Sequence, residues 1–279
     1  MLFWKLSGAG NDFILIEAGA APGAWPRLAR RLCQRGTSVG ADGLLVVRRA
    51  AKGRPARLRY FNADGSAAFC GNGSRAAAWW MYRRGWVKKL FSFETDRGVL
   101  EAEIVRDGVA RVKMPAARIL RTSIALRAGG KTFTAHALHT GVPHVVVPVR
   151  EVESVDVQTL GRAIRRHPLF RPEGANVNFI AFNEAPARLR TYERGVEAET
   201  LACGTGVTAC AVLAVALELA GFPFQVRVRS GDVLSVDCRA GLPVAPWAKG
   251  GARRVVPGAV FDQLWLEGPA KIVYTGEIK

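Results

Sequence analysis

The sequence predicts an α+β fold built from two similar lobes. A block containing Tyr60, a polar turn, Cys70-Gly71-Asn72-Gly73 and an alanine-rich run recurs later as Tyr192, a turn, Cys203-Gly204-Thr205-Gly206 and a second such run. A weak internal repeat of this kind indicates two lobes of similar architecture. The second run is apolar on nearly every face, so we expect that helix to be buried all round, for instance inside a curled sheet.

Both cysteines of the repeat are expected at a helix N-terminus. Strong helix formers run from Arg75 to Arg84 and stop at Gly85, and the run from Val207 to Leu219 is followed by Gly221. Free N–H groups and the positive end of the helix dipole gather at such a position, where they favour a thiolate and can hold a carboxylate.

Two lobes facing each other would place the two cysteines on opposite sides of one carbon centre. A thiolate could then act as the base on one face and a thiol as the acid on the other, which inversion requires.

The other elements follow from local patterns. Pro26 indicates the first turn of a helix over 25–34, and Asp156 is the expected N-cap of a helix over 156–164. Asp107-Gly108 predicts a hairpin turn. We interpret 115–123 as the crossover between lobes and the Gly- and Pro-rich segment 239–257 as a loop, either padding or an accessory contact. The expected strands are 3–6, 13–17, 44–47, 57–61, 91–95, 99–105, 109–114, 131–138, 145–149, 177–182, 187–192, 225–230, 233–238, 260–266 and 271–274.

Composition narrows the class of protein. The chain has 279 residues, 49% hydrophobic and 23% charged, as in a globular protein of two ordinary domains. Neither a secretory signal nor a membrane-spanning run is evident, and five cysteines without framework spacing favour a reduced, cytoplasmic setting. The net charge of +17 is spread over short basic groups without an RNA-binding pattern. We interpret it as a solvated basic surface and expect neither nucleic acid nor membrane partners.

The remaining histidines and cysteines give weaker signals. His144 follows a Gly-x-Pro turn at the start of a strand, which favours a functional role, whereas His136, His139 and His167 lack such support. No grouping of His, Cys or carboxylates has zinc-ligand spacing, so we predict no metal. The other three cysteines are interpreted as packing residues: Cys33, Cys210 and Cys238.

A series of motifs in this order resembles the diaminopimelate epimerase family, which interconverts LL- and meso-diaminopimelate without a cofactor. The resemblance covers most of the chain. The motifs are Lys5-Leu6-Ser7-Gly8-Ala9-Gly10-Asn11-Asp12-Phe13, the block from Asn62 to Arg75, Gly141-Val142-Pro143-His144, Asn176-Val177-Asn178-Phe179, Glu193-Arg194-Gly195, Cys203-Gly204-Thr205-Gly206 and Gly268-Pro269-Ala270.

The resemblance implies a fold and a set of roles. Each lobe is expected to be a mixed, curled sheet or barrel around a central helix, with lobe boundaries at 1–117 plus 269–279 and at 118–268. The family also implies a homodimer that needs no pyridoxal phosphate. Cys70 and Cys203 match the catalytic thiols, and His144 and Glu193 match their polar partners. The positions that match substrate-binding groups are Asn11, Asn62, Gly71, Asn72, Asn176, Glu193, Arg194, Gly204 and Thr205.

Two alternatives remain open at the level of the sequence. Three residues instead of the family's usual four separate Ser66 from Cys70, and Val142 stands where Asn often precedes Pro-His. A related cofactor-independent racemase of another small amino acid is therefore the second hypothesis. The third is a redox or regulatory protein that uses Cys70 and Cys203 as a switchable disulfide, although redox pairs are more often Cys-x-x-Cys.

Overall fold

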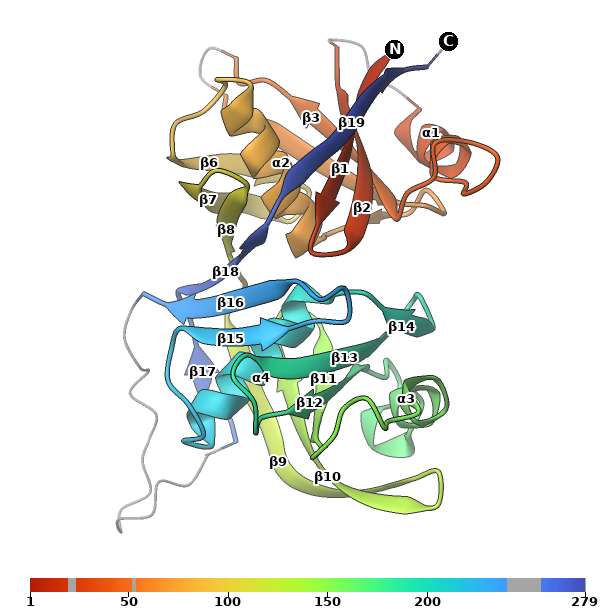
Figure 1. The fold of residues 1–279 in the computed structure, drawn as a ribbon, viewed down its shortest axis with the longest axis vertical. Helices are drawn as coiled ribbons and strands as arrows, with labels where there is room; N and C mark the ends of the chain where they lie inside the picture. Colours follow the sequence, from red (N-terminus) through yellow and green to blue (C-terminus); the bar gives the residue numbers. More distant parts are fainter. Residues whose placement is uncertain (20–23, 52–53, 240–256, 279) are drawn as a thin grey trace. The chain divides into compact units, whose positions relative to one another are not determined.

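The chain is divided into two compact units. The computed structural model describes residues 1–19, 24–51, 54–239 and 257–278. One unit contains Met1–Lys113 together with Glu267–Lys279, and the other contains Met114–Leu266 (Figure 1). The first unit is therefore discontinuous in sequence, and the second is inserted as a single stretch.

The first unit is a mixed sheet around the helix α2, Gly71–Arg83. The pairs β2–β3 and β4–β6 are parallel, and the other described pairs in this unit are antiparallel. Strands on several sides pack against α2 (Figure 1), whereas α1, Trp25–Leu32, lies against β3 and β4. The strands are β1 Leu2–Gly8, β2 Asn11–Glu17, β3 Gly43–Arg48, β4 Arg57–Asn62, β5 Ala67–Ala68, β6 Leu90–Thr95, β7 Gly98–Arg106, β8 Val109–Lys113 and β19 Lys271–Glu277.

The second unit repeats this plan around α4, Gly204–Ala216. Strands β11 and β12 pair in parallel, β12 and β13 are antiparallel, and the helix α3, Val157–Arg165, packs on β12, β13 and β14. A 3₁₀ turn follows at Pro168–Phe170. The strands are β9 Ala117–Ala128, β10 Lys131–His139, β11 Pro143–Pro148, β12 Asn176–Ala181, β13 Ala187–Glu193, β14 Ala198–Thr200, β15 Phe224–Arg227, β16 Val233–Cys238, β17 Val260–Phe261 and β18 Leu264–Pro269, which leads back to the first unit.

The central helix of each unit is buried, although the two helices differ in composition. Every residue of α4 from Gly206 to Ala214 is buried, in agreement with its uniformly apolar composition. Helix α2 is equally enclosed although it carries Asn72, Ser74 and Arg75, whose side chains are buried polar groups. The predicted α+β fold, with a mixed sheet around a central helix in each lobe, is confirmed.

One detail differs from the sequence-based prediction. The expected crossover at 115–123 is mostly strand, because β9 begins at Ala117; its alternation of buried and exposed side chains outweighs the break signal of Pro115. Helices α2 and α4 each begin directly after their cysteine, so both cysteines lie at a helix N-terminus as expected. The predicted loop at 239–257 lies, apart from Arg239 and Pro257, outside the described residues.

Candidate functional site

Cys70 is the N-cap residue of α2. Its backbone is extended, with φ −133° and ψ 112°, and its sulfur accepts a hydrogen bond from the N–H group of Gly73 at 3.4 Å. The thiol is partly exposed. The first-turn N–H groups of α2 and the helix dipole therefore surround this sulfur with positive potential, which favours its thiolate form.

Cys203 has the same position in the second unit. It is the N-cap residue of α4, with φ −127° and ψ 106°, close to the backbone angles of Cys70. Its sulfur lies 3.4 Å from Thr205 Oγ1 instead of an amide, and the residue is only 6% exposed. The internal repeat therefore extends from sequence to backbone geometry, and each unit presents one cysteine at the start of its central helix.

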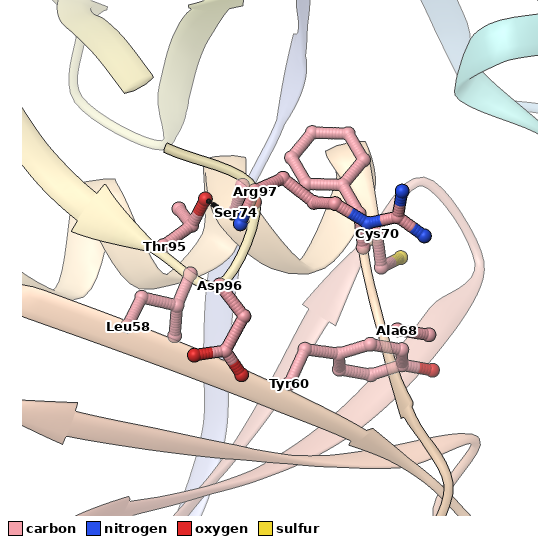
Figure 2. Close-up of a pocket in the computed structure, with 9 residues that line it drawn as sticks. Leu58, Tyr60, Ala68, Cys70, Ser74, Thr95, Asp96 and Arg97 are labelled. Atoms are coloured by element: carbon pink, nitrogen blue, oxygen red, sulfur yellow. Dashed lines mark hydrogen bonds between the residues drawn. The ribbon is translucent and has the colours of Figure 1, made fainter. Parts of the chain in front are cut away.

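Figure 2 shows a small cavity beside Cys70 within the first unit. The cavity has room for about one water molecule. Asp96 on its wall is held by Arg57 at 3.0 Å and by Arg59 at 3.1 Å. Burial alone would raise the pKa of Asp96, but these two guanidinium groups outweigh it and lower the pKa. The lining residues are Leu58, Tyr60, Ala68, Phe69, Cys70, Ser74, Thr95, Asp96 and Arg97.

Two of the predicted substrate-binding residues of the first unit lie together. Asn72 Nδ2 donates to Asn11 Oδ1 at 2.7 Å, although 61 residues separate them. Asn11 Nδ2 in turn donates to Asp42 Oδ2 at 3.0 Å. Asn62, at the end of β4, donates instead to Ser66 Oγ at 3.0 Å within its own turn. Asn11 and Asn72 thus form one amide pair beside the N-terminus of α2.

A network of charged side chains is connected to this amide pair through Asp42. Lys5, which is 7% exposed, contacts Asp12 Oδ2 at 2.6 Å and donates to the carbonyl of Gly40. Arg35 bridges Asp12 at 2.5 Å and Asp42 at 2.8 Å. Burial alone would raise the pKa of Asp12, but the hydrogen bonds and charges of Arg35 and Lys5 together lower it. Asp12 therefore stays ionised at neutral pH and neutralises a buried ammonium group.

Replacing Asp12 by Asn should destabilise the protein by about 3 kcal/mol, because Lys5 would remain buried without its counter-charge. Since the folded-state pKa of Asp12 lies below its ordinary value of 3.8, this stabilisation is complete above that value and is lost as the pH falls through the folded-state pKa. Urea midpoints of wild type and Asp12→Asn should therefore converge in acid. Asp107→Asn, at an exposed pair with Arg83, is the matched control and should have little effect. Equal losses in the two variants would contradict the prediction.

The predicted polar residues of the second unit meet where β11, β12 and β13 lie side by side. His144 on β11 is the register partner of Asn176 on β12. Asn176 Oδ1 accepts from the N–H group of Arg194 at 2.8 Å, and its Nδ2 donates to Pro143 O at 3.3 Å. Asn176 therefore ties the start of β11 to the turn after Glu193. The Arg194 side chain forms an ion pair with Glu173 at 3.6 Å.

His144 is uncharged at neutral pH. It is only 1% exposed, and burial, together with the nearby charges of His139 and Arg194, lowers its pKa to about 3. Its Nδ1 lies 3.0 Å from Nδ2 of Asn178 on β12. The sequence motif contained Asn178, but no local pattern indicated that this side chain contacts the histidine.

Of the other cysteines, Cys33 and Cys210 are buried in the core, whereas Cys238 is partly exposed. Burial raises the pKa of Cys33 to about 11 and raises that of Cys210 well above its ordinary value, so neither thiol ionises readily. Cys238 donates a hydrogen bond to Asp262 O at 3.3 Å. Within the described ranges, no group of three or more His, Cys, Asp and Glu side chains is arranged to hold a metal ion. Nor does any helix in the described part have the length and apolarity needed to cross a membrane.

Comparison with known proteins identifies relatives over the whole chain. Residues 3–120 and 136–254 match the family model described as diaminopimelate epimerase. The diaminopimelate epimerase of Aquifex aeolicus is 43% identical over 257 residues, covering 85% of this chain and 90% of the relative. That of Hydrogenobaculum sp. is 37% identical and covers 99% of this chain and 98% of the relative.

More distant solved structures share the fold. A phenazine biosynthesis protein of the PhzF family from Bacillus anthracis matches 100% of this chain and 99% of its own with a TM-score of 0.73 at 15% identity. A hydroxyproline epimerase from Agrobacterium vitis, solved with bound trans-4-hydroxy-L-proline, covers 99% of this chain and 91% of its own with a TM-score of 0.69 at 17% identity. At such identities these structures support the architecture alone. The family model and the close relatives decide the family: this chain belongs to the diaminopimelate epimerase family of isomerases.

Proposed function

We propose that this protein interconverts LL- and meso-2,6-diaminopimelate without pyridoxal phosphate, using Cys70 and Cys203 as its two acid–base groups. The observation that carries the proposal is the matched placement of the two cysteines, each an extended N-cap residue of its unit's central helix. Relatives named diaminopimelate epimerase at 43% and 37% identity support the choice of substrate.

In the proposed mechanism, the thiolate of one cysteine removes the α-proton and the thiol of the other returns a proton to the opposite face. The two cysteines exchange roles in the reverse direction, because each ends a turnover in the state in which the other began. The carbanion that develops is stabilised through the α-carboxylate, which binds the first-turn amides of the two helices. Those amides belong to Gly71, Asn72, Gly204 and Thr205.

The polar side chains have complementary roles in the proposal. Asn11, Asn62, Asn176 and Arg194 hold the carboxylate and ammonium groups of the substrate, for which amide and guanidinium groups are suited. His144 and Glu193 are the polar partners of the reacting groups. The thiols need a reducing compartment, so we place the reaction in the cytoplasm, where its product would serve lysine and peptidoglycan synthesis. The homodimer implied by the resemblance stays a prediction.

The decisive experiment is incubation of the reduced protein with LL-diaminopimelate in deuterated water, without added cofactor. The proposal predicts deuterium at one α-carbon together with formation of the meso isomer, since the returning proton comes from a solvent-exchanged thiol. The same assay with other amino acids in place of diaminopimelate, including proline and hydroxyproline, tests the alternative racemase. Folded protein with both thiols free that exchanges no α-proton of diaminopimelate would refute the proposed substrate.

A further inference from the structure

Asn178 lies at the centre of a buried polar cluster in the second unit. The residue is 0% exposed and belongs to β12, between β11 and β13. Its Nδ2 donates to the carbonyl of Val145 at 3.1 Å and lies 3.0 Å from Nδ1 of His144. Its Oδ1 accepts from Thr191 Oγ1 at 3.1 Å. Each end of the amide therefore has a defined partner.

The carbonyl of Val145 fixes which way this amide points. A backbone carbonyl can only accept hydrogen bonds, so the NH₂ group of Asn178 must face it. In the reverse orientation Oδ1 of Asn178 would face the carbonyl oxygen of Val145, and two acceptors would lie against each other. The second hydrogen of the same NH₂ group then points to Nδ1 of His144. Nδ1 must accept, and so it carries no proton. A neutral imidazole has one proton, which is therefore on Nε2.

Nε2 of His144 is thus a buried donor. Among the described residues it has no hydrogen-bond partner, and its exposed area is below 1 Å². A buried donor without an acceptor is destabilising, so it is expected where a ligand supplies the acceptor. Because burial keeps the ring neutral, Nε2–H can give a hydrogen bond but has no free lone pair with which to take a proton.

The cluster is packed directly against the turn that begins with Cys203. A Cβ atom built on Gly206 would lie 2.3 Å from Asn178 Oδ1 and 3.4 Å from Cys203 Cβ. Only a glycine at this position of α4 leaves room for the Asn178 amide. The orientation of His144 is therefore fixed by contacts within the same unit that presents Cys203.

We infer that Asn178 is a positioning residue that holds His144 as the neutral Nε2–H tautomer, so that His144 donates a hydrogen bond to negative charge in the reacting complex. In this arrangement His144 does not take the proton of a cysteine thiol. The consequence for catalysis rests on the proposed function, but the tautomer itself does not, because it follows from contacts present without substrate.

The test is ¹⁵N NMR of the protein labelled at its histidine rings, with the signals of His144 assigned from their loss in His144→Gln. The wild type should show a protonated Nε2 and an unprotonated Nδ1 at neutral pH. In Asn178→Asp the carboxylate can only accept, so the proton should move to Nδ1, and kcat for epimerisation should fall about 10²-fold with a smaller change in KM. Thr191→Val, which disturbs the cluster but keeps the NH₂ contacts, should leave the tautomer unchanged.

The outcomes separate this inference from the proposed function. A wild-type spectrum with Nδ1 of His144 protonated, or with both nitrogens protonated, overturns the inference whatever the activity. An unchanged tautomer and unchanged kcat in folded Asn178→Asp also overturns it. The expected wild-type tautomer in a protein that does not turn over diaminopimelate would support the positioning role of Asn178 while refuting the proposed substrate.

Discussion

Alanine at either Cys70 or Cys203 should lower kcat for epimerisation of diaminopimelate by about 10³-fold or more, because each removes one of the two acid–base groups. The double variant should be scarcely worse than either single variant, since residues that act as a unit give strongly non-additive losses. Formation of meso-diaminopimelate and α-deuterium incorporation would be measured in the same reaction.

A matched control is available in Cys238, which lies outside the repeated blocks and donates to a backbone carbonyl. Cys238→Ser keeps a donor at that position and should retain wild-type activity. Substantial epimerisation by folded Cys70→Ala or Cys203→Ala would refute the two-thiol mechanism. A comparable loss in Cys238→Ser would instead show that replacing a cysteine outside the repeated blocks is enough to perturb the protein.

The second large effect is expected from Gly206→Ala. The new methyl group would lie 2.3 Å from Asn178 Oδ1, well inside van der Waals contact, and Asn178 is held by Thr191, Val145 and His144. Overpacking of this kind costs about 1–3 kcal/mol. Because Asn178 must move and release His144, kcat should also fall, by about 10²-fold. Urea denaturation and steady-state kinetics measure the two effects.

Two comparisons make the Gly206 prediction specific. Gly221 has no atom within 4 Å of its built Cβ, so Gly221→Ala should change stability by no more than about 0.5 kcal/mol. Truncating the obstructing side chain should relieve the strain, so Gly206→Ala combined with Asn178→Ala should be more stable than the sum of the two single changes predicts. Additive losses would show that the clash with Asn178 is not the cause.

Sequence reasoning succeeded where the signal was local. The two cysteines could be placed at helix starts because each precedes a glycine and an alanine-rich run, and the burial of α4 followed from its composition. It could not find contacts made by strand pairing. Asn178 meets His144 only because β11 and β12 pair in parallel, and Asp96 reaches the cavity beside Cys70 through the β6–β7 hairpin. Such pairs are remote in sequence and leave no periodic pattern.

The pairing of β1 with β19 bears on how the protein is made. Leu2 is the register partner of Glu277, and Arg75 of the central helix α2 donates through Nε to Pro269 O at 3.4 Å. The first unit therefore needs residues from both before and after the second unit, which is one uninterrupted stretch. On a ribosome that adds about 5–20 residues per second, the second unit has its full sequence first. The unit that contains Cys70 cannot complete its sheet until β19 has been synthesised. The helix N-terminus around Cys203 can therefore form before the one around Cys70, in the reverse of their order along the chain.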